Sequence, residues 1–131
     1  MKPDRRQYKF QELETCHLAL TYLDIIYSIA YSMSNSERFN ITSQLLRAAT
    51  SIVLNIAEGS TGQSDTEHAR FLSMASRSFL ETVACLDVIE RRNYLHIDTV
   101  RKLKDLGHRL FAKLQGRSWG YGDFGPVLVG T

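Results

Sequence analysis

The chain has 131 residues, of which 44% are hydrophobic and 23% are charged, and its formal net charge is only +2. This length fits one domain with one core, and the composition excludes a disordered, fibrous or highly charged protein. No apolar stretch reaches the roughly 20 residues that a membrane helix needs, and the first residues do not resemble a secretory signal. The sequence therefore predicts a soluble cytoplasmic protein.

Basic residues concentrate in two parts of the sequence. The balance is four basic residues to one acidic residue over 1–9, four to ten over 10–90, and eight to two over 91–117. The positive charge therefore belongs to the N-terminal arm and to the last predicted helix, and not to the whole chain.

Prolines occur only at Pro3 and Pro126, so long segments run without a helix breaker. Apolar spacings of three and four predict two helices in the first half, over about 11–33 and about 42–58. The predicted core positions of the first helix are Leu13, Cys16, Leu20, Leu23, Tyr27 and Ala30. Those of the second, which ends at Gly59, are Leu45, Ala49, Ile52 and Ile56.

The second half predicts two more helices. Ser64 and Glu67 have the spacing of a capping box, so the third helix is expected to begin near residue 65 and to end around 92–93. Asp98 is the predicted cap of the fourth helix, which is expected to end at Gly116. The predicted core positions of these two helices are Leu72, Ala75, Phe79, Thr82 or Val83, Leu86, Ile89, Val100, Leu103, Gly107, Leu110 and Leu114.

Four such helices predict an all-α fold, an antiparallel up-down-up-down four-helix bundle, because short connections make sequential helices neighbours. We divide the chain into a basic N-terminal arm over 1–10, a bundle domain over 11–116 and a tail rich in glycine and aromatic residues over 117–131. The tail shows neither helical nor strand periodicity, so it is either flexible or an arm that docks on another surface.

Acid–histidine pairs are the candidates for a metal site, and three have the i, i+3 spacing of di-iron bundles: Glu14/His17, Asp65/His68 and Asp105/His108. The first and third point away from the predicted core, whereas metal ligands must converge. No phosphate-binding loop or catalytic triad pattern is present. The sequence therefore predicts no metal, no cofactor and no enzymatic activity, and Cys16 and Cys85 are expected to be buried thiols.

The second predicted helix carries a polar line beside its apolar stripe. The members of this polar line are Gln44, Arg47, Ser51, Asn55 and Glu58. One interpretation is an ordinary solvent-facing surface. The other is that these groups pair across a helix or subunit contact, with Glu81 or Arg77 of the third helix as partners.

Basic residues cover the side of the fourth predicted helix opposite its leucines. Together with two arginines before that helix, the candidate phosphate-binding residues are Arg91, Arg92, Arg101, Lys102, Lys104, Arg109 and Lys113. The arm would extend this surface with Lys2, Arg5, Arg6 and Lys9. The same side chains would also suit an acidic protein surface or plain solvent.

A longer pattern covers the second predicted helix. Residues 41–59 read ITSQLLRAATSIVLNIAEG, which resembles the signature of the bacterial four helix bundle protein family, also called the 23S rRNA-intervening-sequence protein family. Residues 71–81, FLSMASRSFLE, are similar to the second block of that family. The pair Cys16–His17 and the C-terminal tail depart from the family pattern.

The resemblance implies a left-handed antiparallel bundle that assembles into a homo-oligomeric ring, commonly a pentamer, with the polar line and Glu81 contributing to assembly. Related accessory proteins of diversity-generating retroelements form similar barrels that bind nucleic acid and a reverse transcriptase. Members encoded within rRNA intervening sequences imply a link to RNA. We therefore expect a non-enzymatic, ring-forming protein that binds RNA or a ribonucleoprotein through its basic face. The alternative is an oligomeric scaffold that docks a partner protein such as a reverse transcriptase.

Overall fold

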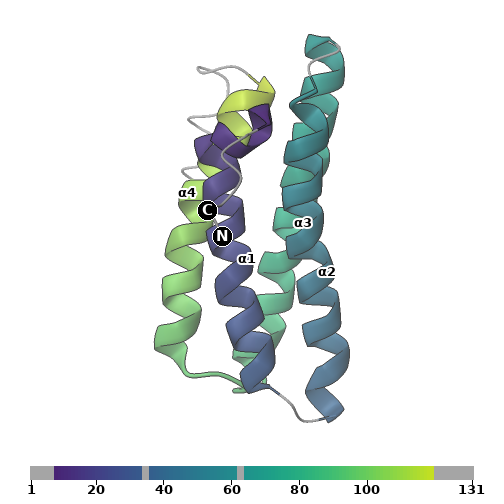
Figure 1. Cartoon of the computed structure of the whole chain (residues 1–131). Helices are drawn as coiled ribbons and strands as arrows, with labels where there is room; N and C mark the ends of the chain where they lie inside the picture. Colours follow the sequence, from purple (N-terminus) through teal and green to yellow (C-terminus); the bar gives the residue numbers. More distant parts are fainter. Residues whose placement is uncertain (1–7, 34–35, 62–63, 120–131) are drawn as a thin grey trace, which may run out of the picture.

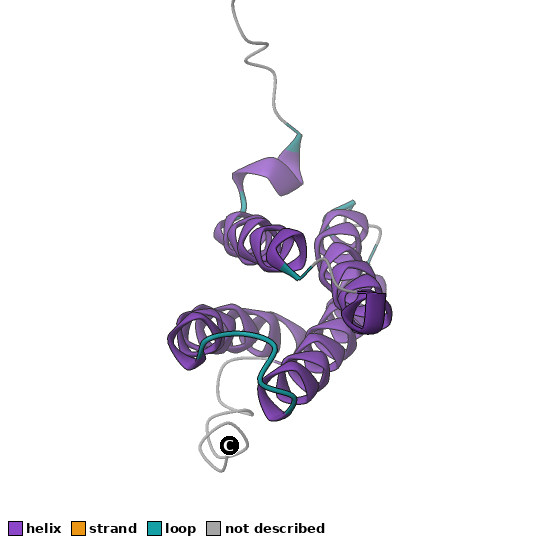
Figure 2. Cartoon of the chain, turned by 90° about the horizontal axis from the view of Figure 1, so that it is seen from below, coloured by secondary structure: helices purple, strands orange, loops and turns teal. Residues whose placement is uncertain are grey.

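The structure, a computed structural model, describes residues 8–33, 36–61 and 64–119. These residues form a short 3-10 helix, η1 (Lys9–Glu12), and four α-helices, α1 (Glu14–Ser32), α2 (Ser36–Gly59), α3 (Asp65–Arg91) and α4 (Ile97–Trp119). Successive α-helices run in opposite directions (Figure 1), and seen along their axes they surround a common interior (Figure 2). The predicted antiparallel four-helix bundle is confirmed.

Both ends of α3 lie where the sequence predicts them. The Ser64 hydroxyl accepts a hydrogen bond from the Glu67 backbone N–H at 3.1 Å, so it caps the first turn. At the other end Asn93 adopts a left-handed conformation with φ of 57°. The N–H groups of Asn93 and Tyr94 then bond back to Glu90 and Ile89, which closes the helix and turns the chain toward α4.

Other predicted boundaries were wrong by several residues. The chain forms η1 before α1, with Leu13 extended between them, so the first α-helix begins only at Glu14. The second helix begins earlier than predicted, at Ser36, and the fourth continues beyond Gly116 to Trp119.

Asp98 is not the cap of α4, because it already lies inside the helix. Its backbone N–H instead donates to His96 Nδ1 at 3.2 Å. The His96 imidazole therefore caps the start of α4, which is the role predicted for Asp98.

The predicted core positions of α2, α3 and α4 are buried, with Thr82 rather than Val83 fully inside. The predicted stripe of α1 is confirmed at Cys16, and Leu13 and Leu23 pack against the core, but it was wrong at two positions. Leu20 and Tyr27 are exposed, and the buried residues of this helix and its C-terminal cap are Thr15, Cys16, Ala19, Tyr22, Ile26, Ile29 and Met33. α1 carries apolar residues on more than one side, so spacing alone could not decide which side packs.

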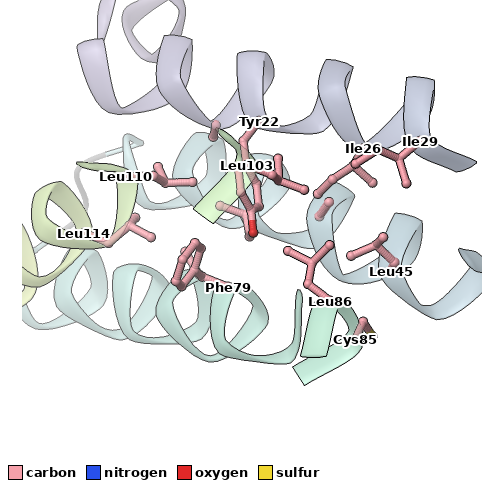
Figure 3. Close-up of a cluster of buried hydrophobic side chains, with 14 of the residues drawn as sticks. Tyr22, Ile26, Ile29, Leu45, Phe79, Cys85, Leu86, Leu103, Leu110 and Leu114 are labelled. Carbon is pink, nitrogen blue, oxygen red and sulfur yellow. The ribbon is translucent and has the colours of Figure 1, made fainter. Parts of the chain in front are cut away.

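A polar contact inside the core joins the buried side of α1 to α3. The Tyr22 hydroxyl lies 2.8 Å from Thr82 Oγ1, and Thr82 donates its only hydroxyl hydrogen to the Phe79 carbonyl, so Tyr22 is the donor to Thr82. Figure 3 shows Tyr22 reaching from α1 into the cluster of aliphatic side chains. Burial raises the pKa of Tyr22 to about 12. The phenol is therefore satisfied as a neutral group.

Aromatic rings fill the space between α1, α3 and α4. The Phe79 ring lies 5.6 Å from the Tyr22 ring and 5.2 Å from the Phe111 ring, measured between centroids. A Cβ atom on Gly107 would lie 3.1 Å from two carbons of Phe79 and 3.3 Å from one carbon of Tyr22. Glycine at this position therefore lets α4 approach the rings.

We expect Gly107→Ala to lower the free energy of unfolding by about 1 kcal/mol, because overpacking against rings held on both sides outweighs the helix propensity of alanine. Gly116→Ala is the matched control, since a Cβ there meets nothing within 4 Å. That variant should gain up to about 1 kcal/mol. Urea unfolding measures both, and equal stabilisation of the two variants would contradict the close packing at Gly107.

Candidate nucleic-acid interface

The basic residues of α4 lie on two sides of the helix and not on one face. Lys113 Nζ lies 2.8 Å from Glu14 Oε2 of α1, whereas Lys104 Nζ contacts carboxylates of α3. Lys102 and Arg109 share the side of Lys113, because they precede it by eleven and four residues, and Arg101 lies one turn before Lys104. The single basic face predicted from sequence is therefore two rows, one toward α1 and one toward α3.

Lys104 and Lys113 are already engaged by carboxylates of the same chain. Lys104 Nζ lies 3.1 Å from Glu90 Oε2 and 3.4 Å from Asp87 Oδ1. The hydrogen bond that Lys104 donates to Glu90, together with the charges of both carboxylates, raises the pKa of Lys104. These two lysines join α4 to its neighbours, so their charges are less available to an outside phosphate than those of cations without such contacts.

The other five candidate cations are exposed: Arg91, Arg92, Arg101, Lys102 and Arg109. Within the described residues, none of them makes a hydrogen bond or ion pair. All but Arg109 lie at one end of the bundle, where α3 turns into α4, at the bottom of Figure 1. We call these four residues, Arg91, Arg92, Arg101 and Lys102, the basic end.

The carboxylates near the basic end do not pair with its four cations in the part of the chain that the structure describes. Asp87 and Glu90 are held by Lys104. Asp98 lies beside His96, with 3.5 Å between the carboxylate and Nδ1. Asp98 and Asp105 lie three or four residues from Arg101 and Lys102 on α4, so they lower the positive potential there, but neither forms an ion pair with a cation of the basic end among the described residues.

Lys9, the one cation of the predicted arm among the described residues, does not extend this surface. Lys9 belongs to η1, which lies at the opposite end of the bundle from the α3–α4 turn (Figure 1). Lys2, Arg5 and Arg6 lie outside the described residues. Lys9 therefore lies at the opposite end of the bundle from Arg91 and Arg92, and the three do not form the one surface predicted from the sequence.

The centre of the polar line pairs α2 with α3. Ser51 Oγ lies 2.8 Å from Ser78 Oγ, and the Asn55 amide donates to the Ser51 carbonyl at 2.9 Å and to its hydroxyl at 3.1 Å. Ser78 was not identified from the sequence. Its signal was its place in the second block of the family pattern, where a small polar residue allows close approach of the two helices.

The charged members of the polar line have no ion-pair partner among the described residues. Arg47 and Glu58 form no ion pair with Glu81 or Arg77 in the part of the chain that is described, and all four side chains are exposed. Gln44 is also exposed. The predicted pairing therefore does not occur within one copy of the chain.

A shallow depression on α2 lies beside these groups. Its lining residues are Leu46, Arg47, Thr50, Ser51, Leu54 and Asn55. Leu54 is 59% exposed, and Leu80 of α3 is exposed as well. Large exposed leucines next to unpaired charges are typical of surfaces that meet another protein.

The acid–histidine pairs do not form a metal centre in the described residues, where no group of three or more His, Cys, Asp or Glu side chains converges. His17 Nε2 and His68 Nδ1 instead contact backbone carbonyls, at 2.6 Å and 2.7 Å. Cys16 and Cys85 are free and buried, and burial raises the pKa of both thiols. Across the described ranges, no helix has the length and apolar character to cross a membrane.

We expect Lys104→Glu to lower the free energy of unfolding by about 1–2 kcal/mol, because it replaces two attractions with repulsion from Asp87 and Glu90. Lys102→Glu, with the same charge change but no partner among the described residues, should change stability by less than about 0.5 kcal/mol. Thermal unfolding at low and high salt checks both, and the difference should narrow as salt screens the charges. Equal losses for the two variants would show that Lys104 has no structural role.

Comparison with known proteins places this geometry in a family. The family model described as 23S rRNA-intervening sequence protein matches residues 11–116. A solved protein of unknown function from the S23 ribosomal protein family of Bacteroides thetaiotaomicron has the same fold, with a TM-score of 0.75 and 22% identity over 80% of this chain and 98% of that one. None of the curated proteins compared with the chain matches it. The chain belongs to the 23S rRNA-intervening sequence protein family.

Proposed function

We propose that this chain is a non-enzymatic RNA-binding protein that works as a homo-oligomer, and that RNA meets the basic end. The observation that carries this proposal is the gathering of Arg91, Arg92, Arg101 and Lys102 at one end of the bundle without partners in the described residues. Arginine favours phosphate because its planar guanidinium donates two parallel hydrogen bonds to phosphate oxygens. The family's name, which refers to 23S rRNA, supports RNA as the nucleic acid.

Self-association would make these contacts effective. One basic end offers only a few phosphate contacts, whereas an assembly repeats them and raises the effective concentration of each on one long strand. Leu54, together with Arg47 and Glu58, which have no ion-pair partner among the described residues, would supply apolar area and charges for a subunit contact on α2. We favour a ring, with the five copies that the family resemblance implies.

We expect the wild-type protein to have an oligomeric mass by light scattering at micromolar concentration. Leu54→Asp should reduce this mass to that of the monomer, because the depression on α2 would then carry a charge into the contact. Ile97→Asp, which changes another exposed aliphatic residue outside this surface, should leave the mass unchanged. A wild-type protein that is monomeric would contradict the proposal.

The RNA proposal predicts that Arg91→Glu with Arg101→Glu abolishes most binding in an electrophoretic or anisotropy assay at low salt. Each cation that contacts a phosphate releases about one counterion from the RNA on binding. Removing two cations should therefore make the slope of log affinity against log salt concentration shallower by about two. Binding should vary little between unrelated sequences, since phosphate contacts carry no sequence information.

The matched control is Lys9→Glu with Arg109→Glu, which has the same charge change away from the basic end. This variant should keep most of the affinity. An equal loss of RNA affinity in both double variants would show that binding depends on total charge and not on the basic end. Absence of any salt-sensitive binding by the wild type would rule out the RNA proposal.

A second candidate function is an oligomeric scaffold that docks a partner protein, such as a polymerase. The observation that favours it is the depression on α2, which combines exposed Leu54 with Arg47 and Asn55. An oligomer that binds no RNA, and whose Leu54→Asp variant still assembles, would favour this function over RNA binding.

A further inference from the structure

Aromatic side chains are exposed at the same end of the bundle as the basic end. The side chain of Tyr31, in the last turn of α1, is 87% exposed, and that of Phe39, in the first turn of α2, is 67% exposed. Helix α1 ends and α2 begins at the end where α3 turns into α4 (Figure 1). Tyr27, one turn before Tyr31, is about half exposed. Among the described residues none of these three side chains has a ring contact or side-chain hydrogen bond.

One exposed aromatic residue is common and needs no explanation. Here the exposed rings share one end of the molecule with four cations that have no partner in the described parts of the chain. The exposed leucines Leu54 and Leu80 lie elsewhere on α2 and α3. Proteins that hold single-stranded nucleic acid combine these two elements, because cations follow the phosphates and aromatic rings stack on the bases. The composition of this end therefore suits a single strand.

The dimensions of a four-helix bundle agree with this ligand. Packed helices lie about 8–10 Å apart, so the end of the bundle is roughly 20 Å across. A strand of roughly four to six nucleotides can cross that distance, which is at the lower end of known single-strand sites. Tyr27 and Tyr31 are four residues apart, so they lie on one side of α1 with about 6 Å between them along the axis.

Double-stranded RNA would not use the rings. In an A-form duplex the bases are stacked on one another, and proteins recognise it through phosphates and 2′-hydroxyl groups. Unpaired bases can instead leave their own stack and lie on an aromatic side chain. Exposed Tyr31 and Phe39 therefore favour a single-stranded segment over a duplex.

We propose that this end of the bundle binds single-stranded RNA, with phosphates on the basic end and unpaired bases stacked on Tyr31 and Phe39. This inference rests on the proposed RNA-binding function and narrows its ligand to unpaired segments. A second copy of the chain is the competing occupant of the rings, and the experiment below separates the two.

The experiment measures the affinity of the full chain for three probes of equal length, about twelve nucleotides. The probes are single-stranded oligouridine, an RNA duplex, and a strand of the same backbone without bases. Wild type should bind oligouridine at least about tenfold more tightly than either other probe, because base stacking adds to the phosphate contacts. Tyr31→Leu with Phe39→Leu keeps apolar side chains but should lose about tenfold on oligouridine alone.

The matched control is Tyr8→Leu, because Tyr8 is 74% exposed and precedes η1 at the opposite end. This variant should bind all three probes as the wild type does. If the rings contact the bases directly, replacing the rings should weaken binding only to the probe that has unpaired bases. This coupling between rings and bases distinguishes direct contact from an indirect effect.

Wild type that binds all three probes equally would overturn the stacking inference and leave the broader RNA proposal standing. Wild type that binds none of them would overturn both. A Tyr31→Leu, Phe39→Leu variant whose oligomeric mass falls, measured by light scattering, would assign the rings to a subunit contact and overturn the single-strand inference.

Discussion

The packing of Phe79 against Gly107 determines how α4 is oriented in the bundle. A Cβ on Gly107 would lie 3.1 Å from the Phe79 ring, which is held between Tyr22 and Phe111. Residues of a helix have fixed angular positions relative to one another, so turning Gly107 toward the rings also fixes every other side chain of α4. Lys104 then faces α3, where its ammonium group meets carboxylates.

In this orientation the basic residues at α4 form two groups among the described residues, one paired with carboxylates and one not. Lys104 and Lys113 contact carboxylates of α3 and α1 and help to hold the bundle together. The basic end lacks such partners within the described residues, and pairing it with phosphates would require no existing ion pair to break. The exposed rings of Tyr31 and Phe39 lie at the same end, which links the packing of the core to the proposed contact with single-stranded RNA.

Most of the fold followed from the apolar spacing, because α2, α3 and α4 each have one dominant stripe and the buried positions match it. Helix α1 followed it only in part, since it has apolar residues on several sides and the spacing misplaced Leu20 and Tyr27, which are exposed. That error placed Tyr27 in the core and concealed the exposed aromatic surface. The candidate cations were all found from sequence, but their pairing depends on residues distant along the chain, such as Glu14 with Lys113.

The most direct test is ultraviolet cross-linking of the wild-type protein to single-stranded uridine-rich RNA, followed by mass spectrometry of the linked peptides. Such cross-links form between residues and bases in contact, so they locate the strand without any substitution. We predict links within residues 25–39 and 91–102, on both sides of the same end of the bundle. Links confined to η1 or to the outer surface of α2 around Leu54, or none in these two ranges, would contradict the assignment of RNA to the basic end.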